Sequence, residues 1–185
     1  MNKKKVLMTG ATGYIADQML PTFRGRYEML LTDISTKNRR GEDVEGITIT
    51  DLIDPDRSRY AGLFEGVDAV VHLAYKRRGN DLLDDFFDEK ANVEMAYNVL
   101  RSAYDAGVPR VVFASSNHAA DWYERVLIHE RKMEALDPYE LALSDNFYGW
   151  AKATYEHMGF LFACGAFGRK MGVVNVRIGA PRELK

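Results

Sequence analysis

The glycine-rich run TGATGYIA at residues 9–16 constrains the fold of this chain more than any other segment. It directly follows the apolar residues 6–8, which are typical of a buried strand. Gly10 and Gly13 then give a Gly-x-x-Gly-x-x-Ala spacing. Glycine permits a tight strand-to-helix turn and leaves room for a pyrophosphate at the N-terminus of the next helix. The run therefore predicts a strand, turn and helix that bind a dinucleotide.

Strand-like and helix-like segments alternate along the rest of the chain. Strands are predicted at 5–9, 28–32, 47–50, 68–74, 110–114 and 173–178, and helices at 13–24, 56–65, 81–107 and 146–171. This alternation is typical of an α/β fold with a doubly wound parallel sheet of the Rossmann type. We interpret residues 1–185 as one nucleotide-binding domain.

Asp33 is the first residue whose position favours a particular cofactor. It ends the predicted second strand, twenty residues after Gly13. A carboxylate at that point accepts hydrogen bonds from ribose hydroxyls and repels a 2′-phosphate, so it favours NAD over NADP. A solvated loop acid is the alternative, and Lys37, Arg39 and Arg40 nearby leave NADP open.

Three further residues have the chemistry of proton transfer. Tyr148 and Lys152 are four apart in a predicted helix and therefore share a face. A lysine ammonium beside a phenol stabilises the phenolate, which makes the tyrosine a usable general base. Ser116 follows a predicted strand whose end would lie beside the nucleotide, where its hydroxyl can hold a substrate oxygen. The alternative for Ser116 is a residue that ends the strand and only caps the next turn.

Taken together, these motifs resemble those of the extended short-chain dehydrogenase/reductases, the NAD-dependent epimerase/dehydratase family. The resemblance covers nearly the whole chain and adds HLA at 72–74, ASS at 114–116 and YGWAK at 148–152. FASSNH at 113–118 and VRIG at 176–179 look most like uronate dehydrogenases. It implies an NAD-dependent oxidoreductase that acts on a hydroxyl of a sugar or sugar acid. Family members usually continue with a C-terminal substrate lobe, which these residues do not include.

The resemblance also implies which residues line the cofactor. Asp51 and Leu52 would frame the adenine, while Asn92 and Ile178 would lie near the nicotinamide half. The full set implied to contact NAD is Gly10, Gly13, Tyr14, Ile15, Asp33, Asp51, Leu52, Leu73, Ala74, Tyr75, Asn92, Tyr148, Lys152 and Ile178.

For the substrate, the resemblance implies contacts from Ser116, Asn117 and His118, and Arg77 is expected to pair with a carboxylate. The chain departs from the uronate dehydrogenases at Tyr14, near Arg77 and at Ala180, where that group carries Gln, Ser and Ser, so the exact substrate stays open. Two other functions also stay open: a nucleotide-sugar epimerase or dehydratase that retains its NAD, and a nucleotide-binding protein without catalysis.

The composition argues against nucleic-acid and membrane partners and indicates a cellular compartment. The net charge of −2 gives no basic face for nucleic acid, and no apolar run approaches the 18 residues of a transmembrane helix. We see no signal peptide, so a cytoplasmic location is expected. The histidines lack metal-ligand spacing, and Cys164 is expected to be a buried, inert thiol. The apolar surplus of the predicted helices 81–107 and 146–171 predicts a homodimer. The segment 121–145 is expected to rim the site, as a lid or as a surface insertion.

Overall fold

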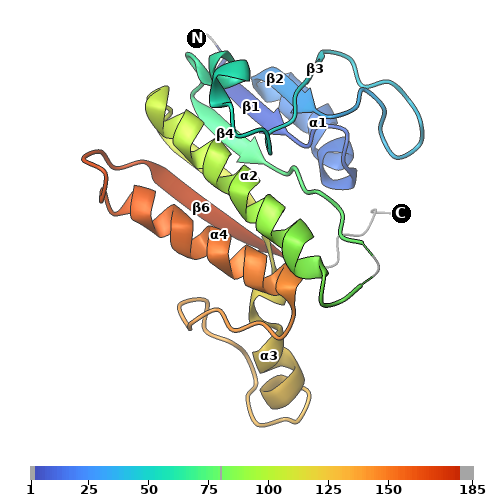
Figure 1. Ribbon diagram of the computed structural model, residues 1–185, viewed down its shortest axis with the longest axis vertical. Coiled ribbons are helices and arrows are strands. Elements are labelled where there is room, and N and C mark those ends of the chain that lie inside the picture. The colour runs from blue at the N-terminus through green and yellow to red at the C-terminus, as the bar shows by residue number, and fades with distance from the viewer. Residues whose placement is uncertain (1–2, 80, 180–185) are drawn as a thin grey trace.

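The computed structural model describes residues 3–79 and 81–179, which contain a six-stranded parallel sheet of order β3-β2-β1-β4-β5-β6 (Figure 1). Its strands are β1 (Lys5–Thr9), β2 (Glu28–Asp33), β3 (Ile47–Ile49), β4 (Ala69–His72), β5 (Arg110–Ser116) and β6 (Gly172–Ile178). The chain proceeds outward from β1 to β3 and then in the other direction from β4 to β6. This doubly wound order confirms the predicted Rossmann fold and puts the topological switch point between β1 and β4.

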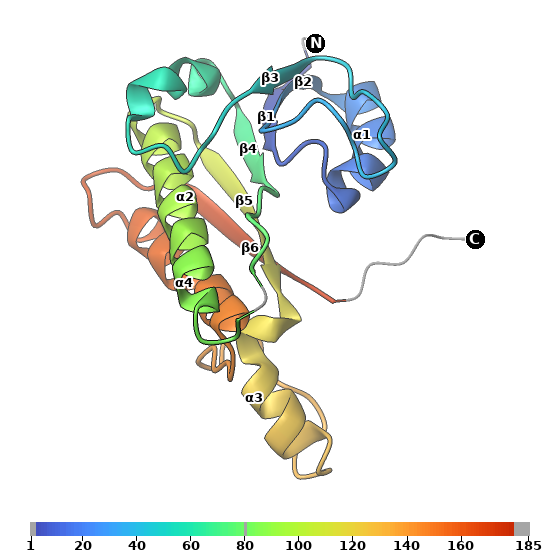
Figure 2. The same ribbon diagram turned by 45° about the vertical axis from the view of Figure 1, so that its right-hand side comes forward.

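Helices cover both faces of this sheet. Helices α2 (Asp85–Asp105) and α4 (Phe147–Ala163) lie side by side on one face, and α1 (Tyr14–Arg26) lies on the other (Figures 1 and 2). On β1, Leu7 joins the core under α2 and α4, whereas Met8 joins the core under α1. Successive strand residues point to opposite faces, so a strand covered on both faces is apolar throughout. This burial explains why the first strand was recognisable as a continuous apolar run.

Two predicted helices differ from the structure. Residues 56–65 form two short 3-10 turns, η1 (Arg57–Arg59) and η2 (Ala61–Phe64), because the Asp56 carboxylate accepts a hydrogen bond from the Ser58 backbone N–H and closes a local turn instead. Helix α4 ends at Ala163 rather than at residue 171. Gly165 and Gly168 adopt positive φ angles of 85° and 94°, which a right-handed helix cannot include.

The prediction of a buried Cys164 is wrong. This residue follows the last turn of α4 and is exposed, and its thiol donates a hydrogen bond to the carbonyl oxygen of Leu161 at 3.4 Å. Its aromatic neighbours Phe160 and Phe167 are themselves 67% and 53% exposed, so they do not enclose it. An aromatic-rich segment therefore does not bury a thiol when it extends past the end of its helix.

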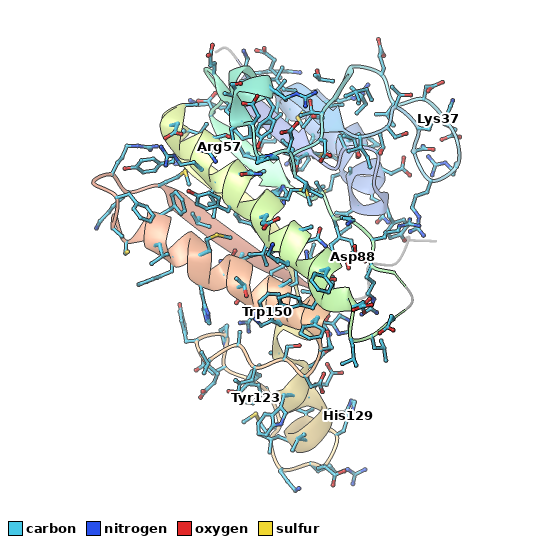
Figure 3. The ribbon with its side chains drawn as sticks, viewed as in Figure 1. Lys37, Arg57, Asp88, Tyr123, His129 and Trp150 are labelled. Atoms are coloured by element: carbon cyan, nitrogen blue, oxygen red, sulfur yellow. The ribbon has the colours of Figure 1, made fainter. Side chains whose placement is uncertain are left out.

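The segment after β5 projects away from the sheet. It contains the turn η3 (Asn117–Ala120), the short helix α3 (Asp121–Tyr123) and the π-helical turn η4 (Glu124–Ile128), and Figure 3 labels Tyr123 and His129 in it. Within the residues that the structure describes, no helix is long and apolar enough to cross a membrane, and no three potential ligands gather to hold a metal. Ala180 lies outside the described residues.

Candidate active site

The turn between β1 and α1 lies directly against the chain that leaves β4. Gly10 has a φ of 68°, and a Cβ there would lie 2.6 Å from the carbonyl carbon of Leu73 and would also collide with the backbone of Ala74. Any other residue at this position would force the two strand ends apart. The structure therefore brings together Gly10, Leu73 and Ala74, which were predicted to line the cofactor from separate motifs.

The N-terminus of α1 is available to a phosphate. Gly13 is its N-cap and supplies no side-chain hydrogen bond, so the first backbone N–H groups, which include those of Tyr14 and Ile15, have no side-chain cap. Such N–H groups, with the positive end of the helix dipole, bind anions.

Asp33 is anchored at the end of β2 beside this turn. Its Oδ2 accepts hydrogen bonds from the backbone N–H of Thr12 at 2.9 Å and from the Thr12 hydroxyl at 2.7 Å. These two bonds fix the carboxylate next to the glycine turn, where the sequence predicted a ribose contact.

The three basic residues that left NADP open, Lys37, Arg39 and Arg40, make different contacts. Arg40 pairs with Asp17 at 2.7 Å, and Lys37 pairs with Asp43 at 3.1 Å in the loop labelled in Figure 3. The Arg39 guanidinium instead lies 5.6 Å from the centre of the Tyr14 ring. Arg39 thus lies beside the first residue of α1, and Arg40 is bound to the first turn of the same helix.

Lys152 is enclosed by aromatic rings on the opposite side of β4. Its ammonium donates a hydrogen bond to the carbonyl oxygen of Ala114 at 2.9 Å and lies 5.5 Å from the ring centre of Tyr148. The rings of Tyr75 and Tyr155 lie at 5.4 and 4.9 Å. Because only 5% of Lys152 is exposed, loss of hydration lowers the pKa of its ammonium to about 8. The predicted pair of Tyr148 and Lys152 is therefore present, one helical turn apart on α4.

Glu89 is a buried carboxylate of this site that the sequence analysis missed. It is fully buried, and it accepts hydrogen bonds from the Tyr75 hydroxyl at 2.5 Å and from the Asn92 amide at 3.3 Å. Burial raises the pKa of Glu89, and its negative charge raises that of Lys152. The available signal was its spacing, since Glu89 precedes Asn92 by three residues and so shares its helix face.

Asn92 itself acts on the backbone after β4. It is fully buried, its side-chain oxygen accepts a hydrogen bond from the Lys76 N–H at 2.7 Å, and its amide donates to the Lys76 carbonyl at 2.9 Å. These bonds hold the segment that carries Leu73, Ala74 and Tyr75.

The turn that follows β5 brings His118, one of the predicted substrate residues, beside Tyr148. The Ser116 hydroxyl accepts a hydrogen bond from the His118 N–H at 3.2 Å and lies 3.4 Å from the Asn117 side-chain oxygen. The His118 ring packs edge-on against the Tyr148 ring with centres 5.5 Å apart. A Cβ on Gly149 would overlap the His118 carbonyl oxygen, so the start of α4 lies directly on η3.

The remaining predicted residues lie at the margins of this arrangement. Ile178 is the register partner of Ser116 at the ends of β6 and β5. Leu52 packs in the core under α2, Asp51 accepts a hydrogen bond from the Ile53 N–H, and both follow β3. Arg77 is exposed beyond β4 and makes no ion pair within the described part of the chain.

Comparison with known proteins places this arrangement in a family. Residues 6–177 match the model of the NAD dependent epimerase/dehydratase family. The uronate dehydrogenase of Pseudomonas syringae pv. tomato is 31% identical over 95% of this chain and 59% of its own length. The NAD-dependent glucose-6-phosphate dehydrogenase of Haloferax volcanii is 31% identical over 94% of this chain and 67% of its own length.

A solved structure agrees with these sequence matches. The glucuronic acid dehydrogenase of Chromohalobacter salexigens superposes with a TM-score of 0.75 at 27% identity, over 96% of this chain and 61% of that protein. The chain thus spans about three fifths of the length of the uronate dehydrogenases it matches. The glycine turn, Asp33 and the Tyr148–Lys152 pair are consistent with the matched family. The match over residues 6–177 shows that this chain belongs to the NAD-dependent epimerase/dehydratase family.

Proposed function

We propose that this chain forms the cofactor-binding and proton-transfer part of an NAD-dependent dehydrogenase that oxidises a hydroxyl group of a sugar acid. The observation that carries the proposal is the position of the Lys152 ammonium. It lies against the Tyr148 ring and is held by the carbonyl of Ala114, two residues before Ser116. A phenol, an ammonium and a hydroxyl are thus collected at the end of one parallel sheet, where ligands of this fold bind.

The residues present fit NAD, the cofactor of the family. Gly10 lets the turn pack tightly against the chain that leaves β4, the uncapped N-terminus of α1 suits a pyrophosphate, and Asp33 suits a ribose. When bound, NAD supplies the acceptor for the hydride that leaves the substrate carbon.

Residues of this chain would remove the proton of the substrate hydroxyl. In this proposal the Ser116 hydroxyl binds the substrate oxygen, and the Tyr148 phenolate removes its proton. Lys152 stabilises that phenolate by its positive charge. Loss of the hydride and of the proton converts the alcohol into a carbonyl group, and at the anomeric carbon of a uronate the product is a lactone.

Two observations support a sugar acid as the substrate. Ser116, Asn117 and His118 carry a hydroxyl, an amide and an imidazole in succession, and the last of these packs against Tyr148, which suits a ligand with several hydroxyl groups. Similar proteins are named for uronates and glucuronic acid. Arg77 is the cation proposed to pair with the carboxylate.

NADH formation tests this function. Glucuronate, galacturonate, glucose and a nucleotide-linked hexose are each supplied with NAD to this chain and to any longer polypeptide that contains it. We expect NADH from the uronates first, and the Tyr148→Phe variant is expected to be slower by about 10²- to 10⁴-fold with NAD affinity unchanged. Tyr139→Phe is the matched control, because Tyr139 is 95% exposed. Turnover of the nucleotide sugar without NADH from either uronate would instead identify an epimerase.

We also propose that the outer face of α2 and α4 pairs two copies of the chain. Phe87 and Tyr97 on α2 and Phe160 and Leu161 on α4 are 66%, 41%, 67% and 46% exposed. Tyr155 and Phe162, which contributed to the predicted apolar surplus, are used by the chain's own core instead. Light scattering is expected to give the mass of a dimer, and Phe160→Glu to give a monomer. Phe167→Glu, an exposed aromatic beyond α4, is the control, and a monomeric parent refutes the pairing.

A further inference from the structure

We propose that Asp121 is a positioning residue that fixes the tautomer of His118, so that the imidazole Nε2 accepts a hydrogen bond from a hydroxyl of the substrate. The proposal rests on the proposed function for the identity of the substrate, but the tautomer itself is a property of this chain. The observation behind it is the contact between the His118 Nδ1 and the Asp121 Oδ2, at 2.5 Å. The sequence motifs predicted a role for His118 but none for Asp121.

The chemistry of the pair determines which ring nitrogen carries the proton. A carboxylate only accepts hydrogen bonds, so a short contact with Nδ1 requires that Nδ1 carry the hydrogen. In the neutral imidazole, Nε2 then keeps its lone pair and is an acceptor. This arrangement selects a ligand group that donates, such as a sugar hydroxyl.

Asp121 is held in place independently of His118. The Asn146 amide donates a hydrogen bond at 3.1 Å to the same Oδ2 atom. Asn146 is also the N-cap of α4, where its side-chain oxygen accepts the Gly149 N–H at 2.9 Å. The Asp121 side chain is only 16% exposed, whereas that of His118 is 51% exposed. The carboxylate is thus recessed and fixed to the helix that carries Tyr148, and the imidazole lies at the surface of the site.

The His118 ring is held on its other sides as well. Its backbone N–H donates to the Ser116 hydroxyl at 3.2 Å, and its ring packs edge-on against the Tyr148 ring. With Nδ1 bound to Asp121, Nε2 is the ring nitrogen left for a ligand. Ser116, Tyr148 and His118 would therefore act on one molecule, the first two at the reacting hydroxyl and His118 at a neighbouring one.

The replacement Asp121→Asn removes the group that can only accept. An asparagine can turn either its NH2 group or its carbonyl oxygen toward Nδ1, so the ring hydrogen is no longer required at Nδ1. Asp145→Asn is the matched control, because Asp145 also accepts a hydrogen bond from Asn146, at 3.1 Å, but does not contact His118. Both replacements conserve side-chain size and remove one negative charge.

Nitrogen NMR of ¹⁵N-histidine-labelled chain, at a pH where His118 is neutral, measures the tautomer without substrate or cofactor. The chain has four histidines, and the signal lost in His118→Gln identifies the relevant one. We expect the Nδ1–H form in the parent and in Asp145→Asn, and a larger fraction of the Nε2–H form in Asp121→Asn. An Nε2–H form in the parent, or loss of the Nδ1–H form in Asp145→Asn, overturns the proposal.

Kinetics of the active enzyme tests the consequence for specificity. Asp121→Asn is expected to lower kcat/KM for the uronate by about tenfold, the worth of one hydrogen bond, through KM more than kcat and with NAD affinity unchanged. For a deoxy analogue that lacks the hydroxyl bound by His118, Asp121→Asn should lower kcat/KM by less. In the His118→Gln background, Asp121→Asn should change kcat/KM little further. Equal losses with both sugars refute the specificity role. Absence of turnover with every uronate refutes the proposed function while the NMR result stands.

Discussion

Gly149 offers the sharpest test of how α4 is placed in the site. It is a buried residue in the first turn of α4, between Tyr148 and the rest of the helix. A Cβ at this position would overlap the His118 carbonyl oxygen and the Ser144 hydroxyl, and would lie 2.8 Å from the His118 carbonyl carbon. Gly149→Ala must therefore separate α4 from η3, although alanine is the better helix former.

The two opposing effects can be compared. Alanine in place of glycine favours a helix by about 0.8–1 kcal/mol. Overpacking in a close contact costs about 1–3 kcal/mol, and here the obstacle is backbone that cannot rotate away, which favours the upper half of that range. The Ser144 hydroxyl could move, but it would lose its hydrogen bond to the Asn146 carbonyl, at 3.2 Å. We expect a net destabilisation of about 1–2 kcal/mol.

Urea unfolding followed by circular dichroism measures this difference as a lower midpoint at unchanged slope. A thermal scan should show a fall of about 2–4 °C for each kcal/mol in a chain of this size. Gly25→Ala is the matched control, because Gly25 lies near the end of α1 and a Cβ added there would have no described atom within 4 Å. The same substitution should stabilise the chain there by up to about 1 kcal/mol. If Gly149→Ala stabilises the chain as Gly25→Ala does, α4 does not lie on η3 as described.

Three further predictions concern charged or titrating side chains. Burial lowers the pKa of His72 from 6.5 to about 3, so the unfolded chain binds the additional proton and the free energy of unfolding falls as the pH drops between these values; His72→Gln should flatten that dependence in urea titrations from pH 7 to 4. Tyr75→Phe should cost about 1–3 kcal/mol, because it leaves the Glu89 carboxylate without its hydroxyl partner, and adding Glu89→Leu should recover part of the loss. Asp33→Ala should narrow the difference between NAD and NADP affinity in calorimetry; tighter binding of NADP than NAD by the parent contradicts the role given to Asp33.

Much of the fold could be predicted because parallel strands buried on both faces are continuous apolar runs. All six strands were located, and this reason holds best for β1, whose residues 6–8 are all buried; β3 and β6 lie at the edges of the sheet and are partly exposed. The helix boundaries were harder to predict, because they depend on local backbone choices. The composition near residues 164–171 favours a longer α4, but Gly165 and Gly168 take left-handed angles there and end the helical segment.

The candidate site was predictable where its residues follow strands. Gly10, Asp33 and Ser116 each lie at or just beyond the carboxyl end of a strand, and those ends meet at one edge of a parallel sheet. Glu89 and Asp121 carry no such signal. Glu89 matters because its helix face meets the Tyr75 hydroxyl, and Asp121 because a local turn directs it to His118. Contacts of this kind depend on how elements pack, which a motif does not specify.

Burial shifts the pKa values of Lys152 and Glu89 in opposite directions, and the attraction between the two groups gives the buried carboxylate a role in the site. Loss of hydration disfavours both the Lys152 ammonium and the Glu89 carboxylate, so it lowers the first pKa and raises the second. Their mutual attraction opposes both shifts. Without the charge of Glu89 the pKa of Lys152 would therefore lie below its value of about 8, and the ammonium would be lost nearer to neutral pH. In the proposed function, the positive charge beside Tyr148 is thus supported by a carboxylate whose hydrogen-bond partners are Tyr75 and Asn92.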